Sequence, residues 1–395
     1  MNTGLEGNYV LKQNKKLALG YTTGSCSAAA AKAAAKMLFT GERQDFVDLM
    51  TPKGILLHLE VLEQEFTQEA ARCAVKKDAG DDPDVTNGVL VYARVSRGRP
   101  KEIMRKHNMN SAYIYILGGV GVGRVTKPGL EQDVGEAAIN QVPRRMIREA
   151  VVQVCEEQGY GGDITVEISI PEGVELAKKT FNPRLGIEGG ISVLGTSGIV
   201  EPMSEAALIE TIRMEMQMKK NNGAAYLLAA PGNYGMAYLS AHASFSLEQA
   251  VKYSNYVGEL IDFGVEMGFS GILMVSHIGK LIKVAGGIMN THSRNGDARM
   301  ELLAANALLA GAERETLIKI LEAITTDEGL AILKREGLLE MTMKHVMEKV
   351  HGYLDHRAYG HLRIGVIAFS NEWGELGQAG PVEELTKALA EEGNI

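Results

Sequence analysis

Two histidines lie in a glycine-containing segment where they could do proton chemistry on a bound molecule. His277 and His292 both fall in the run SHIGKLIKVAGGIMNTHSR, which covers residues 276–294. An imidazole titrates near neutral pH, so it can exchange a proton or orient an amide or carboxylate. A histidine near the end of a strand can equally be a satisfied structural residue. Both are therefore candidate catalytic residues with a structural alternative.

Two glycine loops form a second group of candidates, because each follows a short apolar run. Gly195-Thr196-Ser197-Gly198 follows the run 191–194, and Pro231-Gly232-Asn233-Tyr234-Gly235 follows the run 225–229. In a doubly wound sheet such loops lie at one edge, with His277 after a third strand, and ligands bind at that edge. We therefore expect a cofactor there. The candidate cofactor-binding residues are Gly190, Gly195, Thr196, Ser197, Gly198, Pro231, Gly232, Asn233 and Gly235.

A third candidate lies at the start of an alanine-rich helix. Thr22, Thr23 and Ser25 precede a run of small residues to Leu38. Thr23 or Ser25 can cap the helix, and Gly41 suits its left-handed end. Amides and hydroxyls at such an N-terminus can bind an anion. The alternative is a well-capped helix whose small residues allow close packing.

An acidic loop and a further glycine loop remain open in function. The segment 77–84 carries Asp78, Asp81, Asp82 and Asp84, which could hold a hard cation or could form a solvated turn. It lacks the calcium-loop pattern. The segment 118–129 lacks the Lys-Ser/Thr pair of a phosphate loop, so it is either a ligand-facing loop with Lys127 as a carboxylate partner or a structural turn.

The elements that must position these residues indicate an α/β protein with two domains. Residues 1–185 predict an α+β domain with a mixed or antiparallel sheet: a hairpin over 46–50 and 55–61, strands at 73–75, 89–95, 112–117 and 164–170, and a helix from Pro143. Residues 186–395 alternate strand, loop and helix and predict a Rossmann-like, mostly parallel sheet flanked by helices. Its strands are expected at 191–194, 225–229, 271–275 and 364–369, and capping boxes at Ser246/Gln249 and Thr325/Glu328.

The whole-chain composition narrows the function classes. With 395 residues, 45% of them hydrophobic, the chain can fill two cores, and its formal net charge of −8 argues against nucleic-acid binding. Cys26, Cys73 and Cys155 fit neither a zinc site nor a disulfide framework, and no apolar run suits a membrane span. We expect a cytoplasmic protein with no metal site of its own and no membrane partner. The oligomeric state stays open, a homodimer included.

Long collinear segments of the sequence resemble the CbiD family, the cobalt-precorrin-5B C1-methyltransferases of anaerobic cobalamin biosynthesis. The resemblance covers nearly the whole chain, with small departures at Ser25, Gln141 and Ser276, where the family pattern leads us to expect Thr, Pro and Gly. The matching segments are GYTTGSCSAAAAKAA, KDAGDDPDVTNG, GGVGVGRVTKPGL, AINQVPRRMI, TFNPRLGIEGGISVLGTSGIVEPMS, PGNYG and SHIGKLIKVAGGIMNTHSRNGDARME.

The resemblance implies methyl transfer from S-adenosyl-L-methionine to ring carbon C1 of cobalt-precorrin-5B, giving cobalt-precorrin-6A, with cobalt present only as part of the substrate. It further implies that the first domain faces the tetrapyrrole and the second binds S-adenosylmethionine. His277 or His292 could then remove a proton or approach the cobalt. The candidate substrate-binding residues are Thr22, Thr23, Ser25, Asp78, Asp81, Asp82, Lys127, Arg144, Arg184, Lys280 and Arg294.

Two other functions are compatible with parts of the sequence. One is an ATP-dependent phosphotransferase with magnesium in the acidic loop, although the phosphate-loop residues are missing. The other is a non-catalytic tetrapyrrole-binding protein, which leaves the cofactor-like second domain without a role.

Overall fold

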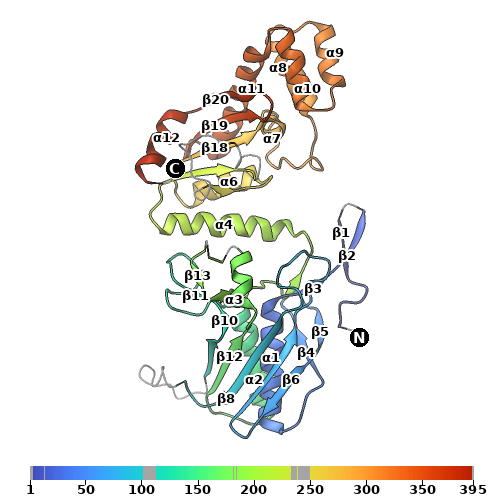
Figure 1. Cartoon of the computed structure of the whole chain (residues 1–395), viewed down its shortest axis with the longest axis vertical. Coiled ribbons are helices and arrows are strands. Elements are labelled where there is room, and N and C mark those ends of the chain that lie inside the picture. The colour runs from blue at the N-terminus through green and yellow to red at the C-terminus, as the bar shows by residue number, and fades with distance from the viewer. Residues whose placement is uncertain are drawn as a thin grey trace. The chain divides into compact units, whose positions relative to one another are not determined.

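The protein is described by a computed structural model that covers residues 3–12, 14–100, 113–180, 182–183, 185–232, 238 and 250–393 (Figure 1). The chain forms two compact units, Met1–Ser204 and Glu205–Ile395. The division falls after Ser204, whereas the sequence predicts it after residue 185. The predicted class, an α/β protein with a mixed sheet followed by a mostly parallel one, is confirmed.

A mixed five-stranded sheet forms the centre of the first unit. The strands near 73–75, 89–95, 112–117 and 164–170 are found where the sequence predicts them. Neighbouring strands run antiparallel except the last pair, β12 and β9, which is parallel. In spatial order the strands are β6 (Leu62–Phe66), β7 (Ala70–Lys76), β8 (Leu90–Arg97), β12 (Ile164–Ser169) and β9 (Ile114–Gly118).

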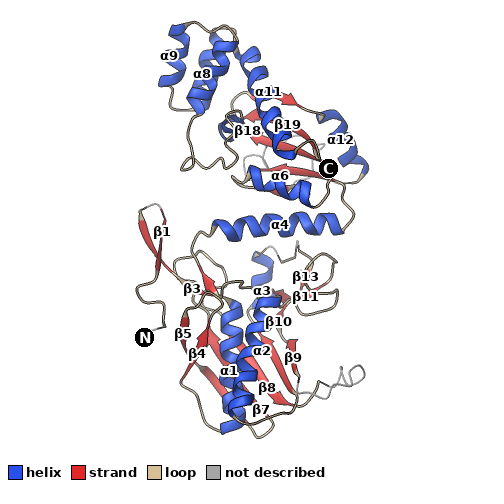
Figure 2. Cartoon of the chain, turned by 180° about the vertical axis from the view of Figure 1, so that it is seen from behind, coloured by secondary structure: helices blue, strands red, loops and turns tan. Residues whose placement is uncertain are grey.

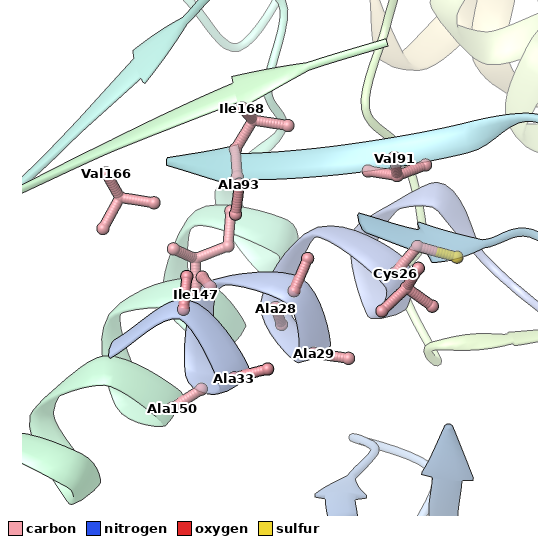
Figure 3. Packing of buried hydrophobic residues seen from close by; sticks show 14 of the residues in the cluster. Cys26, Ala28, Ala29, Ala33, Val91, Ala93, Ile147, Ala150, Val166 and Ile168 are labelled. Atoms are coloured by element: carbon pink, nitrogen blue, oxygen red, sulfur yellow. The ribbon is translucent and has the colours of Figure 1, made fainter. Parts of the chain in front are cut away.

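Two helices cover one face of this sheet, α1 (Thr23–Thr40) and α2 (Gln141–Glu157), which lie side by side in Figure 2. Alternate strand residues, among them Val91, Ala93 and Val166, point toward them (Figure 3). Because α1 presents alanines at the contact, α2 and the sheet approach it closely, and most of α1 is buried. The predicted left-handed end at Gly41 is confirmed. The predicted cap at Thr23 or Ser25 is wrong, because the N-cap is Thr22, whose side chain accepts from the Ser25 amide.

Hairpins and two-residue strands complete the first unit. The predicted hairpin is present as β4 (Phe46–Met50) and β5 (Leu56–Glu60), and a second one joins β1 (Tyr9–Lys12) to β2 (Lys15–Ala18). The short pairs are β3 (Gly20–Tyr21) with β15 (Ile199–Val200), β10 (Gly121–Val122) with β14 (Gly190–Ile191), and β11 (Arg124–Val125) with β13 (Ile187–Glu188); α3 (Gly173–Leu176) and a 3₁₀ turn (Ala177–Lys179) precede β13.

The apolar run 191–194 belongs to this first unit, so its prediction as the opening strand of the parallel sheet is wrong. Gly190 and Ile191 pair with Gly121 and Val122, and Val193 bridges to Ile139. Ile191 and Val193 are buried in the core of the first unit. A four-residue apolar run suits either sheet, and the partner strand decides which one it joins.

A five-stranded, mostly parallel sheet forms the centre of the second unit, as predicted. Its first four strands are parallel and β20 is antiparallel. From β16 the chain moves to β17 on one side and then to β18 on the other, so the winding reverses between β16 and β18. In spatial order the strands are β17 (Val251–Lys252), β16 (Tyr226–Ala230), β18 (Gly271–His277), β19 (Arg363–Ser370) and β20 (Gly374–Ala379).

Helices cover both faces of this parallel sheet. On one face α12 (Val382–Glu391) packs against β16, β18 and β19. The other face packs against α4 (Glu205–Asn221), α6 (Val257–Glu266), α7 (Ile278–Val284) and α11 (Leu339–Ala358). Among the described residues, this unit also contains α8 (Arg299–Leu309), α9 (Arg314–Glu322) and α10 (Thr326–Arg335). The predicted cap at Thr325 is confirmed, and Ser246/Gln249 lie outside the described residues. Within the described ranges no helix is long and apolar enough to span a membrane.

Candidate functional site

The carboxyl edge of the parallel sheet places two of the three predicted loops together. Ala230 ends β16 and leads into Pro231 and Gly232, while His277 ends the neighbouring strand β18. The winding reverses between these two strands, and open α/β sheets bind ligands at such a switch point. Gly232 has a φ of 154°, and no described atom would meet a Cβ at this position. Asn233 and Gly235 lie outside the described residues.

His277 is held at this edge as the N-cap of α7. Its Nδ1 accepts a hydrogen bond from the Gly279 amide at 3.1 Å, and its ring meets Phe369 of β19 edge-on, with centroids 5.5 Å apart. Burial lowers the pKa of His277 below 6.5, and the charge of Asp327 only partly opposes this. The neutral ring therefore carries its proton on Nε2, which makes Nε2 a hydrogen-bond donor.

His292 repeats the same local bond on a separate loop. Its Nδ1 accepts from the Arg294 amide at 3.1 Å, and its own amide donates to Asn290 Oδ1. The side chain is exposed. In the neutral state this ring also has its proton on Nε2. Either histidine can therefore accept a proton at Nε2 only as the other tautomer, with the proton on Nδ1, and that tautomer loses the hydrogen bond from the backbone amide.

The helix α7, which follows His277, carries two partly or fully buried lysines. Lys280 Nζ donates to Ser254 O at 3.3 Å, and Lys283, only 2% exposed, donates to Thr291 O and Ser293 Oγ, both at 3.1 Å. Burial is the main cause that lowers the pKa of both ammonium groups. Lys283 thus ties the His292 loop to α7. Sequence reasoning missed it, and its signal was the i, i+3 spacing from Lys280 in an otherwise apolar run.

Arg294 forms an ion pair with Glu205, and both side chains are exposed. The charge of Arg294 is therefore already paired, at the surface of the second unit. A substrate carboxylate would have to compete with Glu205 for the guanidinium.

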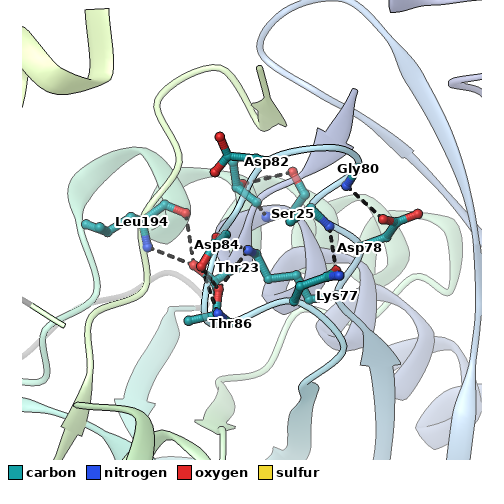
Figure 4. Close-up of polar contacts among 12 residues, drawn as sticks. Thr23, Ser25, Lys77, Asp78, Gly80, Asp82, Asp84, Thr86 and Leu194 are labelled. Atoms are coloured by element: carbon teal, nitrogen blue, oxygen red, sulfur yellow. Dashed lines mark hydrogen bonds and ion pairs between the residues drawn. The ribbon is translucent and has the colours of Figure 1, made fainter. Parts of the chain in front are cut away.

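The loop 195–198 lies in the first unit, against the N-terminus of α1, so the prediction that it shares an edge with Pro231 and His277 is wrong. Figure 4 shows Leu194 beside Thr23, and its backbone amide and carbonyl both bond the Thr23 hydroxyl, at 3.1 and 3.2 Å. Ser25 Oγ donates to Gly198 O at 2.6 Å, and the Thr22 amide donates to the same carbonyl at 3.1 Å. The hydroxyl and amide groups of the predicted anion site therefore form hydrogen bonds to the loop.

The glycines of this loop are explained by that close approach. A Cβ at Gly195 would clash with the Thr22 side chain, one at Gly198 would crowd Thr51, and both residues have positive φ. Gly190 likewise passes against the backbone of Gly121. Ser197 O accepts from the Lys53 amide, its hydroxyl donates to Ile199 O, and Thr196 is exposed.

The carboxylates of the acidic loop are used within the first unit (Figure 4). Asp78 accepts from the Gly80 amide, Asp81 from the Ala18 amide and Asp82 from the Met203 amide. Asp84 forms an ion pair with Lys77 and accepts from Thr86. Burial raises the pKa of Asp84, but the charge and hydrogen bonds of Lys77 and Thr86 outweigh it, so the pKa lies below 3.8.

The carboxylates of the acidic loop form no cluster of metal ligands. Across the residues with described positions, no group of three or more His, Cys, Asp or Glu side chains could hold a metal ion. The phosphotransferase interpretation therefore has no support from the acidic loop.

Arg144, one of the predicted substrate-binding cations of the first unit, has a structural role. Arg144 donates to Ile139 O, Ala137 O and Ile116 O at 2.8, 3.1 and 3.4 Å, which ties the start of α2 to the neighbouring chain. Lys127 is exposed, with its side-chain carbons beside Gly186. Arg184 lies outside the described residues.

Comparisons with known proteins match both units. The CbiD family model matches residues 10–202, and the model of the CbiD C-terminal domain matches residues 290–380. Two relatives named "Cobalt-precorrin-5B C(1)-methyltransferase" come from Ruminiclostridium cellulolyticum, 49% identical over 92% of this chain and 91% of the relative, and Alkaliphilus metalliredigens, 42% identical over 98% of each. A solved structure, the cobalamin biosynthesis protein (cbiD) from Archaeoglobus fulgidus, is 29% identical over 75% of this chain and 88% of that one, with a TM-score of 0.39, too low to support an argument from shape. From these matches it follows that the chain belongs to the CbiD family.

Proposed function

We propose that the protein is an S-adenosylmethionine-dependent methyltransferase that methylates C1 of cobalt-precorrin-5B to give cobalt-precorrin-6A. The observation that carries this proposal is the 49% identity to a relative of that name over more than nine tenths of both chains. The family models match parts of both units, so the resemblance is not confined to one domain.

S-adenosylmethionine supplies an activated methyl group on a sulfonium, and the chain has to align donor and acceptor carbon and exclude water. We propose the carboxyl edge between β16 and β18 as the cofactor site. Gly232 leaves room beside the backbone, His277 lies at the end of β18 with its proton on Nε2, and Lys280 offers an ammonium group to a carboxylate. These donors suit the hydroxyl and carboxylate oxygens of the cofactor. With this site, the loop 195–198 keeps a structural role.

The first unit is then the proposed tetrapyrrole-facing part, with Lys127 as an exposed partner for a substrate carboxylate. Thr22, Thr23, Ser25 and the aspartates Asp78, Asp81 and Asp82 shape this unit through the contacts described above. We place the reaction in the cytoplasm, in keeping with three cysteine thiols that are free and buried.

Mass spectrometry tests the activity directly. Purified protein with cobalt-precorrin-5B and S-adenosylmethionine is expected to add one methyl group to the tetrapyrrole and to release an equal amount of S-adenosylhomocysteine. Omission of either substrate is the control. A tetrapyrrole of unchanged mass with active substrate would refute the proposal, and calorimetric binding of Mg-ATP in place of S-adenosylhomocysteine would favour the phosphotransferase.

A further inference from the structure

A groove in the first unit lies between α1, α2 and the β4–β5 hairpin. Its volume of about 810 Å³ is in the range of small-molecule sites. All three walls belong to the same compact unit. The groove is lined by Lys32 and Lys36 of α1, by residues 48–52 and Leu56 of the hairpin, and by Arg145, Met146, Glu149, Ala150 and Gln153 of α2.

Lys32 is the feature of the groove that calls for a ligand. Its side chain is only 9% exposed, and its Nζ donates to the main-chain carbonyl of Asp48 at 2.9 Å. None of the ion pairs among the described residues includes Lys32, and the Asp48 carboxylate instead meets His58 Nδ1 at 2.7 Å. An ammonium has three N–H donors, and buried charges are normally paired.

The electrostatics agree with a charge that lacks compensation. Burial lowers the pKa of Lys32, and repulsion from Lys36 lowers it further. The carboxylates of Glu157 and Asp48 raise this pKa, but less than the other two causes lower it. An anion in the groove would supply the missing partner.

The two sides of the groove differ in chemistry. Lys36 lies one helical turn beyond Lys32, and Arg145 faces the same groove from α2, where its Nε is 4.0 Å from the nearest Glu149 oxygen. On the hairpin, Met50 and Leu56 are 59% and 49% exposed. The groove thus sets an apolar wall against three cations. Two carboxylates also line it, Glu149 beside Arg145 and Asp48, which meets His58.

We propose that this groove binds the carboxylate-bearing rim of the tetrapyrrole substrate, with Lys32, Lys36 and Arg145 on the carboxylates and Met50 and Leu56 against the ring. The identity of the ligand rests on the proposed function. A flat apolar ring with an acidic periphery matches both walls at once, whereas a simple inorganic anion would leave the apolar wall in water.

Substitution of Lys32 separates a binding role from a structural one. Lys32→Met removes the charge and keeps the volume. We expect it to weaken binding of cobyrinic acid, a stable polycarboxylate cobalt corrin, by about ten-fold or more in calorimetry, because a charge-assisted hydrogen bond is lost. The melting temperature should stay equal or rise, since an unpaired buried charge has been removed. S-adenosylhomocysteine binding should not change.

A second variant and a matched control keep the test valid even if substitution of Lys32 disturbs folding. Lys36→Met combined with Arg145→Met changes side chains nearer the surface and should also weaken corrin binding several-fold. Arg148→Met alters the same helix at an exposed position that does not line the groove and should leave corrin binding unchanged.

Two outcomes overturn the inference. One is unchanged corrin affinity in folded Lys32→Met and in the double variant. The other is a lower melting temperature of Lys32→Met with full corrin affinity, which would make Lys32 an anchor for the hairpin. Failure of the proposed function looks different: wild-type protein would then bind the corrin through Lys32 but transfer no methyl group.

Discussion

Both candidate histidines accept a hydrogen bond at Nδ1 from the backbone amide of the residue two positions later in the chain. The bond selects the tautomer with the proton on Nε2, so Nε2 of each neutral ring is a hydrogen-bond donor. Methyl transfer from a sulfonium gains more from alignment than from strong acids and bases. At the scale of single residues, the proposed site therefore consists of oriented donors.

His277 can be tested by a pair of substitutions that separate its cap from its donor. Asn can accept the Gly279 amide through Oδ1 and retain the cap, whereas Ala cannot. We expect His277→Ala to lower the free energy of unfolding by about 1 kcal/mol and His277→Asn to lower it by less. Both should reduce S-adenosylhomocysteine affinity, as measured by calorimetry. Full affinity in either folded variant would remove His277 from the cofactor site.

The lowered pKa of His277 predicts a pH dependence of stability. The unfolded chain takes up the proton near pH 6.5, before the folded chain does. Stability from the neutral ring is thus present above pH 6.5 and is lost as the pH falls toward the folded pKa. We expect wild type to lose stability relative to His277→Asn between about pH 7 and 5. Urea unfolding followed by Trp373 fluorescence measures the free energy of unfolding of the second unit at each pH. Equal pH dependence in wild type and His277→Asn would contradict the lowered pKa of His277.

Asp84 should contribute more to stability than the other carboxylates of its loop. Asp84→Asn leaves the Lys77 ammonium, 3% exposed, without its ion partner, at a cost of about 3 kcal/mol. Asp78→Asn is the control, because Asp78 accepts from a nearby amide, and its effect should be much smaller. Hydrogen exchange of α1 peptides reports on this unit. Addition of Lys77→Met to Asp84→Asn should recover much of the loss, and no recovery would refute the ion-pair account.

At the scale of elements, the sequence predicts the β4–β5 hairpin, four of the five strands of the mixed sheet and three of the five strands of the parallel sheet. It does not predict which sheet the run 191–194 joins. The run is too short to carry a preference, and its partners Gly121–Val122 lie far back in the chain. Lys32 and Lys283 were missed for a related reason. A lysine in a helix is usually a surface charge, and only the packing of neighbouring elements buries these two.

The packing of the loop 195–198 against α1 can be tested by substitution of its glycine. Gly195→Ala should destabilise the first unit by about 2 kcal/mol, because the new Cβ clashes with Thr22 and the residue has a φ of 142°. Gly189→Ala is the matched control, with a positive φ but open space around it, and it should cost less. S-adenosylhomocysteine affinity should be unchanged in both, by calorimetry. Lower affinity in folded Gly195→Ala would return the cofactor to this loop.

At the scale of the whole molecule, each unit has its own hydrophobic core and its own continuous stretch of chain. We expect residues 205–395 alone to fold with a cooperative transition in Trp373 fluorescence and to bind S-adenosylhomocysteine with an affinity similar to that of the full chain. The complementary fragment 1–204 should bind cobyrinic acid and not S-adenosylhomocysteine. A folded 205–395 fragment without cofactor affinity would contradict this division of binding between the units.

The bonds from α1 to the loop at 194–198 also bear on how the protein is made. Thr23 meets Leu194 across 171 residues, and Ser25 meets Gly198 across 173. A ribosome must therefore synthesise nearly all of the first unit before the N-terminus of α1 can form these hydrogen bonds. Until then the alanine-rich surface of α1 remains unpaired with this loop in the nascent chain. The helix α1 is thus completed by one of the last segments of its unit, while synthesis of the second unit is already under way.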